Sequence, residues 1–215
     1  MKKLCYLSST AALGDLAAHE SIVNEETEWN PEKPHSDYAI SKYGAEMEVW
    51  RGQQEGLAVI IVNPGVIIGP GFPEQGSGQL FKQVANGLSF YTLGSTGFIA
   101  VSDVVRISVQ LTKSKIQNKR YTLIAQNIVF RDLLNTMADA LKVKRPTIHL
   151  TPFLMGVGWR IDWILSTVFG RKRQLTESMA QASCSKNDHS NEKIKAELTT
   201  RFLNVHQYIK EISSL

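Results

Sequence analysis

The residues best suited to chemistry are Tyr38 and Lys42, four positions apart in the run YAISK. Side chains four residues apart on a helix lie on one face, so the phenol and the ammonium would reach the same small volume. A phenol titrates at about pH 10, and a nearby cation favours its ionised form, closer to the range in which proton transfer is efficient. The spacing therefore predicts a tyrosine that acts as acid and base.

Two apolar runs are expected to position this pair as neighbouring strands. Residues 4–7 are followed directly by the hydroxyl cluster Ser8 to Thr10, and residues 57–62 are followed by Asn-Pro-Gly at 63–65. Short apolar runs of this kind predict buried strands. Ligands bind at the carboxyl ends of the strands in open α/β sheets, so both polar breaks are expected at one binding edge.

A helix from Asp37 to Gln54 should carry the pair, because Pro34 and the His-Ser-Asp run after it are a helix start signal. The rest of the chain alternates in the same way, which predicts an α/β fold. Further elements are expected as a Gly- and Pro-rich lid loop over 69–78, a helix over 79–87, a strand over 98–101, a helix over 103–113 capped by Ser102 or Asp103, a strand over 120–125, a helix over 129–142, a strand over 148–150 and three final helices.

Composition excludes several classes of function. The chain has 215 residues, 43% of them hydrophobic and 20% charged, which is ordinary for a globular protein. Its net charge of +4 is mild, and the basic run at 171–173 has no aromatic residues interleaved with it, so no nucleic-acid partner is expected. Two distant cysteines form neither a disulfide framework nor a metal-ligand cluster, which predicts a cytoplasmic protein without a metal.

The most hydrophobic long stretch covers residues 153–169. Arg160 and Asp162 lie in its centre, and it is shorter than the roughly 20 apolar residues of a clean membrane span. It therefore predicts a core or interfacial helix, and no membrane partner. Trp159 and Trp163 share a face of that helix, either as core packing or as the wall of a substrate pocket.

Together these pieces resemble an extended short-chain dehydrogenase/reductase. That group includes the NAD-dependent epimerase/dehydratase family and its dihydroflavonol-reductase-like and 3β-hydroxysteroid-dehydrogenase-like branches. The resemblance spans essentially the whole chain and depends on the order of its motifs. Those motifs are the strand 3–7 with its SSTAALG continuation, YAISK at 38–42, NPGVIIGPG at 63–71, residues 98–103, RYTL at 120–123 and SNEKIKAEL at 190–198.

The resemblance implies roles for individual residues. Ser9 matches the catalytic serine, because it stands five residues before Gly14; Tyr38 matches the acid/base, and Lys42 the partner that lowers its pKa and touches the nicotinamide ribose. Pro64 and Ile67 would lie against the nicotinamide. The implied set is Ser9, Tyr38 and Lys42 for catalysis; Ser8, Tyr38, Lys42, Pro64, Gly65 and Ile67 for the cofactor; and Thr10, Phe72 and Trp159 for the substrate.

The family's opening strand and glycine-rich phosphate-binding turn have no counterpart in this chain. The resemblance thus implies a fragment that lacks roughly the first 110 residues of the parent protein and is inactive in isolation. The expected fold is a partial doubly wound, Rossmann-type parallel sheet without its first strands, followed by a smaller, mostly helical substrate region. The division falls between residues 1–71 and 72–215, and the choice between NAD and NADP stays open.

Local departures from the family pattern bear on the chemistry. Ser9 is followed by Thr-Ala where sugar-nucleotide dehydratases carry Asp-Glu, and residues 95–99 lack the arginine with which nucleotide-sugar epimerases clamp a diphosphate. These features favour an NAD(P)-dependent oxidoreductase that transfers hydride to or from a carbonyl or carbinol of a small organic substrate. A nucleotide-sugar epimerase and a non-catalytic dinucleotide-binding scaffold remain alternatives. A homodimer is possible through the helix that bears Tyr38 and Lys42.

Overall fold

Three parallel strands form the sheet that carries the expected site in the computed structural model, which describes residues 3–16, 20–170 and 176–213. Their order is β1 (Leu4–Leu7), β3 (Val59–Pro64) and β7 (Lys119–Leu123). All six residues of the central strand β3 are buried, whereas β1 is half-buried to exposed. The expected α/β fold with a parallel sheet is confirmed.

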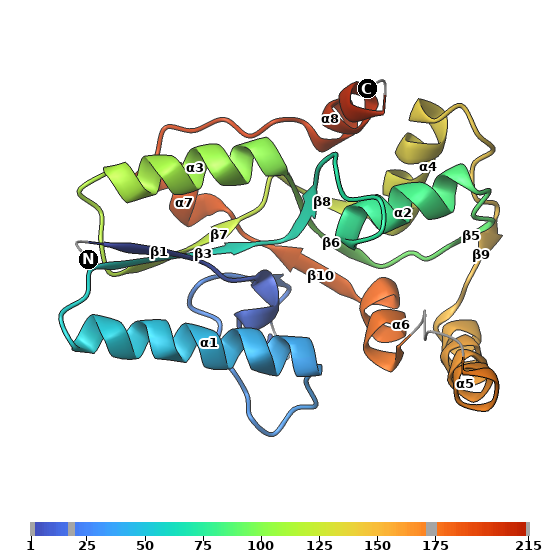
Figure 1. Cartoon of the computed structure of the whole chain (residues 1–215), viewed down its shortest axis with the longest axis horizontal. Helices are drawn as coiled ribbons and strands as arrows, with labels where there is room; N and C mark the ends of the chain where they lie inside the picture. The colour runs from blue at the N-terminus through green and yellow to red at the C-terminus, as the bar shows by residue number, and fades with distance from the viewer. Residues whose placement is uncertain (1–2, 17–19, 171–175, 214–215) are drawn as a thin grey trace.

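Helices cover both faces of this sheet (Figure 1). Helix α1 (Asp37–Gln54) lies on one face and α3 (Val101–Lys113) on the other, where α7 (Glu192–Glu197) also packs against β7. The core under α3 is continuous across the sheet, because Val62 and Tyr121 pack with Ile107 in one buried cluster. This two-sided cover makes β3 wholly apolar until it reaches Asn63.

A second sheet combines β2, from the loop before α1, with strands that follow residue 64. Its order is β2–β10–β6–β4, with β8 antiparallel to β6. The bounds are β2 (Ile22–Val23), β4 (Val66–Ile68), β6 (Ser95–Ala100), β8 (Gln126–Val129) and β10 (Lys186–His189), and a two-stranded sheet pairs β5 (Phe90–Tyr91) with β9 (Ile148–His149). The remaining helices are η1 (Thr10–Ala12), α2 (Gly76–Ala85), α4 (Phe130–Ala140), α5 (Pro152–Phe169), α6 (Glu177–Cys184) and α8 (Val205–Ile212).

Gly65 joins the two sheets. It ends β3 and begins the step to β4, and a Cβ at this position would collide with the carbonyl oxygen of Gly97 on β6 and with the side chain of Ile124. Because only a residue without a side chain permits this approach, the glycine of the Asn-Pro-Gly run fixes where the chain leaves the first sheet.

The long elements lie where the sequence predicts them, with shifted ends. Helix α1 has the predicted bounds. The prediction that Ser102 or Asp103 caps α3 is wrong, because the N-cap is Ala100, which makes no side-chain hydrogen bond. The buried Asp103 instead accepts a hydrogen bond from the Leu203 backbone N–H at 2.7 Å. Strand β3 runs two residues later than predicted, because Asn63 and Pro64 pair with β7.

Short strands account for most of what the sequence analysis missed. β2, β4, β5, β8 and β10 were not predicted, and four helices rather than three follow β9 in the described part of the chain. Two- and three-residue strands are too short to show a period, and β10 has the polar sequence Lys-Asn-Asp-His, which lacks a strand pattern. Tertiary pairing alone defines these elements.

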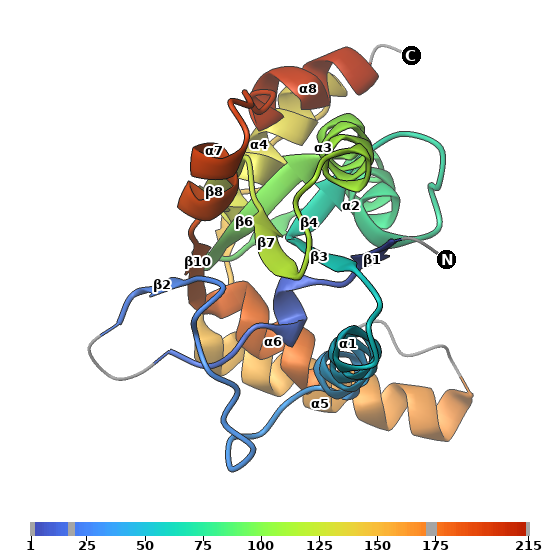
Figure 2. The same cartoon turned by 90° about the vertical axis from the view of Figure 1, so that its left-hand side faces the viewer.

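Helix α5 lies at the periphery, beside α6, in both views (Figure 1 and Figure 2). None of its aliphatic residues belongs to the two main buried clusters, so the alternative that residues 153–169 form a core helix is wrong. Among the residues that the structure describes, no helix combines the length and apolar character needed to cross a membrane.

Candidate functional site

The start of α1 presents Tyr38 and Lys42 together. Ser36 caps the helix, because its hydroxyl accepts a hydrogen bond from the Ala39 backbone N–H at 3.2 Å. Tyr38 follows in the first turn and is 56% exposed. The Lys42 Nζ lies 5.9 Å from the centroid of the Tyr38 ring, so the two side chains share one face of the helix as the spacing predicts.

Ser9 stands at the end of β1, directly before η1. Its hydroxyl oxygen accepts a hydrogen bond from the Ala11 backbone N–H at 3.2 Å, which leaves the hydroxyl proton available for donation. Its carbonyl oxygen accepts a hydrogen bond from Asn63 Nδ2 at 2.9 Å. Since η1 packs against α1, and Thr10 opens η1, the predicted Ser9 and Thr10 lie on the element that faces the helix of Tyr38.

A buried carboxylate that the sequence analysis missed holds these pieces together. Glu46, one helical turn beyond Lys42, has no exposed surface. Its Oε2 accepts hydrogen bonds from Ser8 Oγ at 2.7 Å and Asn63 Nδ2 at 2.9 Å. Its Oε1 receives Arg120 Nη1 at 3.0 Å, in an ion pair with β7. One carboxylate thus ties α1 to all three strands of the first sheet or to the loops at their ends.

This network defines what Ser8 can do. The Ser8 hydroxyl is buried and donates to Glu46, so any contact between this residue and a cofactor would come from its backbone. Arg120 also donates to the Glu25 carbonyl oxygen, and Glu25 Oε1 accepts the Thr122 backbone N–H at 2.6 Å. A buried charge is tolerated only when it is paired and hydrogen-bonded, and Glu46 has three donors. Its place four residues after Lys42 is the signal in the sequence that could have revealed it.

An aromatic stack fixes the loop that leads into α1. The Trp29 ring lies 3.8 Å from the His35 ring and 4.3 Å from the Tyr43 ring, measured between centroids, with both pairs nearly parallel. His35 Nε2 lies 2.8 Å from the Asn30 carbonyl oxygen. The stack anchors residues 29–35 to the second turn of α1, and so holds the helix start that carries Tyr38.

The residues implied for the nicotinamide end lie at the junction of β3 and β4. Pro64 is buried at the end of β3, and the Gly65 backbone N–H donates to the Leu123 carbonyl oxygen at 3.2 Å. The Ile67 side chain packs partly against the core, and Ile67 pairs with Ile99 in the ladder between β4 and β6. The Tyr38 hydroxyl makes no hydrogen bond with the described residues, so Tyr38 and Lys42 fit the role of holding a ribose hydroxyl.

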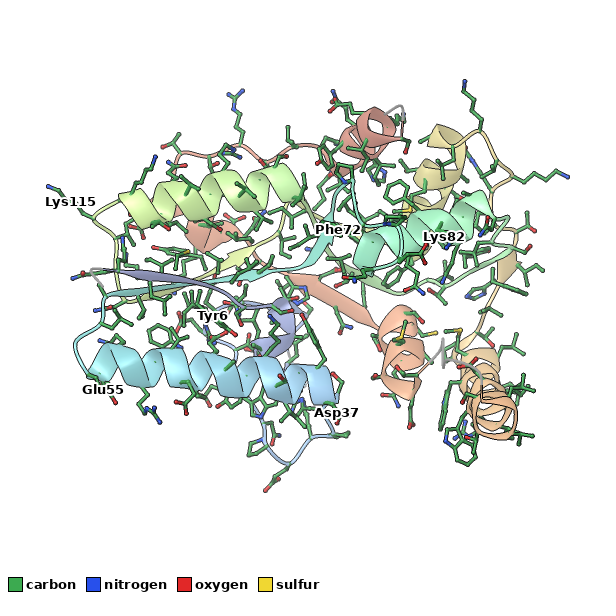
Figure 3. All side chains as sticks on the ribbon, in the orientation of Figure 1. Tyr6, Asp37, Glu55, Phe72, Lys82 and Lys115 are labelled. Atoms are coloured by element: carbon green, nitrogen blue, oxygen red, sulfur yellow. The ribbon has the colours of Figure 1, made fainter. Side chains whose placement is uncertain are left out.

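Two of the three implied substrate contacts lie on other elements than α1 and η1. Phe72 is 73% exposed and lines a cavity of about 540 Å³ with Phe81 of α2 and Ile212 of α8. Figure 3 shows it beside α2, away from Asp37 at the start of α1. Trp159 lies half-buried on α5, with the Arg160 guanidinium 4.6 Å from its ring centroid. Only Thr10 adjoins Ser9.

Comparisons with known proteins identify relatives of this chain. A family model described as "NAD dependent epimerase/dehydratase family" matches residues 1–124. Sterol demethylase protein B from Methylococcus capsulatus is 26% identical over 157 residues, which are 72% of this chain and 47% of that protein. A crystal structure of gox2253 is 25% identical with a TM-score of 0.80, over 99% of this chain and 65% of that one.

A more distant structure shows the same fold. RMD from Pseudomonas aeruginosa, complexed with NADPH, is 19% identical with a TM-score of 0.66, over 99% of this chain and 65% of that one. The chain thus spans about half the length of its curated relative and less than two thirds of these structures. Because the family model covers more than half of the 215 residues, the chain belongs to the NAD-dependent epimerase/dehydratase family.

Proposed function

We propose that this chain carries the catalytic part of an NAD(P)-dependent oxidoreductase that transfers hydride between nicotinamide and a carbonyl or carbinol carbon of a small organic substrate. The observation that carries the proposal is the pair of Tyr38 and Lys42 on one helix face, with Ser9 on the element packed against that helix. Tyr38 is exposed and has no hydrogen-bond partner among the described residues, which leaves its proton free to move.

The side chains divide the work of a carbonyl reduction. The Ser9 hydroxyl donates a hydrogen bond to the substrate oxygen, and Tyr38 gives that oxygen a proton as the carbonyl becomes an alcohol. Lys42 places a positive charge beside the Tyr38 ring. A bound nicotinamide dinucleotide supplies the hydride or, in the reverse direction, accepts it. Tyr38, Lys42 and the backbone at 64–67 would hold its nicotinamide riboside, and the family relation supports either NAD or NADP.

Two observations outside the Ser9, Tyr38 and Lys42 cluster support an apolar substrate without a diphosphate. Residues 95–99 lie within strand β6, where Ser95 Oγ donates to Asp188 Oδ1 at 2.7 Å and no arginine projects. A cavity of about 450 Å³ lies between α4, α5 and α6, and its lining contains no charged side chain. A nucleotide-sugar epimerase would need a cationic clamp, so the oxidoreductase is the better-supported alternative. Free Cys5 and Cys184 support a reducing, cytoplasmic location.

The test is the replacement Tyr38→Phe in the intact protein, assayed by NAD(P)H oxidation with a panel of apolar ketones and aldehydes. Loss of the proton donor should lower kcat by at least about 10²-fold. Tyr43→Phe is the matched control, because Tyr43 lies on the same helix and keeps its ring stack with Trp29 without a hydroxyl. Full turnover by Tyr38→Phe, or an equal loss in Tyr43→Phe, contradicts the assigned role.

A further inference from the structure

The backbone that carries Ser9 is held on both sides of this residue. The Ser8 backbone N–H donates to the Val62 carbonyl oxygen at 2.8 Å, which continues the pairing of β1 with β3. The Ser8 hydroxyl donates to Glu46 Oε2 at 2.7 Å. The Ser9 carbonyl oxygen accepts a hydrogen bond from Asn63 Nδ2 at 2.9 Å. These contacts fix the end of β1 from which the Ser9 hydroxyl projects.

Asn63 links Ser9 to helix α1 through a single amide group. Its Nδ2 donates to the Ser9 carbonyl oxygen and to Glu46 Oε2, both at 2.9 Å. Because both partners are acceptors, only the nitrogen end of the amide can face them, and this fixes the orientation of the side chain. Asn63 has no exposed surface, and its Oδ1 has no hydrogen-bond partner among the described residues. The amide thus keeps two donated bonds at the cost of its own unpaired oxygen.

Glu46 belongs to the same helix as Tyr38 and Lys42. It follows Lys42 by one turn and Tyr38 by about two turns. Its carboxylate is wholly buried and accepts three hydrogen bonds, so it is fixed relative to the helix. Ser9 comes from a different element, and its distance from Tyr38 therefore depends on how α1 holds the end of β1. The bonds to Glu46 Oε2 are the polar contacts that do this.

We propose that Glu46 and Asn63 are positioning residues for Ser9. The carboxylate orients the Asn63 amide and the Ser8 hydroxyl, and these two groups hold Ser9 at the distance from Tyr38 that the reaction requires. The inference rests on the proposed function, in which one substrate oxygen receives a hydrogen bond from Ser9 and a proton from Tyr38. A displacement of about 1 Å in such an arrangement costs about 10²-fold in rate.

Single-turnover kinetics of Asn63→Ala in the intact protein test the positioning. The substrate is a ketone or aldehyde that the wild type reduces, and the decay of NAD(P)H absorbance is followed with enzyme in excess. The rate constant should fall at least about 10-fold, because the amide no longer links Ser9 to Glu46. A purely structural role predicts a different result: fewer folded molecules lower the amplitude of the decay and leave its rate constant unchanged.

Thr122→Ala is the matched control. Thr122 is the partner of Asn63 in the ladder between β3 and β7, and it also has no exposed surface. Its hydroxyl oxygen has no hydrogen-bond partner among the described residues. Both substitutions leave a small buried space in the same part of the sheet, so both should lower the melting temperature. Only Asn63→Ala should lower the single-turnover rate constant.

Ser8→Ala is the second variant, and it decides the matter if Asn63→Ala does not fold. It removes the other bond to Glu46 Oε2 and only one heavy atom. The rate constant should fall by a smaller factor than in Asn63→Ala, because the amide still holds Ser9. Circular dichroism and thermal melting show which variants are folded at the assay temperature.

The outcomes separate this inference from the function on which it rests. A lowered rate constant in the folded Asn63 or Ser8 variant, with Thr122→Ala like the wild type, supports the positioning role. Wild-type rate constants in both variants, with Tyr38→Phe inactive, overturn the positioning role and leave the proposed function intact. An equal loss in Thr122→Ala also overturns it. A wild type that reduces none of the ketones and aldehydes overturns the proposed function and this inference with it.

Discussion

Helices α1 and α5 are both 18 residues long, yet they treat charge and apolar surface in opposite ways. α1 is polar along most of its length and buries a carboxylate completely, at Glu46. α5 is mostly apolar, and six of its large apolar side chains form an exposed outer face: Phe153, Leu154, Val157, Ile161, Ile164 and Val168. The difference teaches that burial follows the partners available to a side chain rather than the side chain's own hydropathy.

The partners explain each helix. α1 packs on β3 and η1, and the first sheet brings three donors to one carboxylate, namely Ser8 after β1, Asn63 of β3 and Arg120 of β7. The hydrogen bonds and the Arg120 charge offset the loss of hydration at Glu46. α5 packs mainly on α6. Six large apolar side chains on its outer face stay between 41% and 77% exposed.

The largest expected effect comes from removing the buried carboxylate of α1. Glu46→Ala leaves Arg120, Ser8 and Asn63 without their shared acceptor, and should lower the free energy of unfolding by about 3 kcal/mol. Urea denaturation measures the change. Glu48→Ala is the control, because Glu48 is exposed on the same helix in a surface ion pair with Arg51, and should cost less than about 1 kcal/mol. Equal costs for the two variants would show that the network does not stabilise the fold.

A second test compares how much the inner and outer faces of α5 contribute to stability. Met155→Ala removes a buried side chain and should cost about 2 kcal/mol or more, because it enlarges an existing cavity. Ile161→Ala removes half-exposed atoms of the outer face and should change stability by about 0.5 kcal/mol at most. Thermal unfolding of both variants gives the comparison. A large cost at Ile161 would mean that the outer face of α5 is covered in solution.

A smaller difference in stability is expected between the loss of a tryptophan in the loop before α1 and the loss of one on α5. Trp29→Ala breaks two stacked contacts that hold the loop before α1, and should cost about 1 to 2 kcal/mol. Trp163→Ala on α5 removes a half-exposed ring and should cost less. Chemical denaturation monitored by circular dichroism avoids the fluorescence that both substitutions change. The order would reverse only if α5 packs more tightly than α1.

The sequence predicts well those features that depend on local pattern. The cap at Ser36, the bounds of α1 and the shared face of Tyr38 and Lys42 all follow from helix geometry. The parallel sheet follows from apolar runs that end in polar residues. These signals lie within a few residues of one another, so no knowledge of the rest of the chain is needed.

Features that depend on distant partners could not be predicted. Glu46 meets Arg120 across 74 positions, and β10 exists because Asp188 and His189 pair with β2. The sequence of α5 shows that the helix is apolar but not which side meets α6. Phe72 and Trp159 were assigned to the substrate by resemblance, and the structure places them on separate elements, the loop before α2 and helix α5.

The smallest expected effect concerns His189, a buried ionisable group without the partners that Glu46 has. Its Nδ1 has no hydrogen-bond partner, and burial lowers the pKa of its imidazole below 6.5, against a weaker opposing effect of the Asn187 backbone and Asp188. Between that lowered pKa and 6.5 the unfolded chain binds more protons than the folded one, so stability should fall as pH drops through this window and be fully present above it.

His189→Gln should flatten the dependence of stability on pH in this window, as measured by urea denaturation on both sides of pH 6.5. The control His149→Gln, at an exposed position on β9, should leave that dependence unchanged. If His189→Gln retains the full acid sensitivity, other groups cause it, and the buried imidazole is matched by its surroundings as well as Glu46 is. The buried carboxylate on α1, with three donors, and the buried imidazole on β10, with an unpaired nitrogen, would then not differ in how well their surroundings compensate for burial.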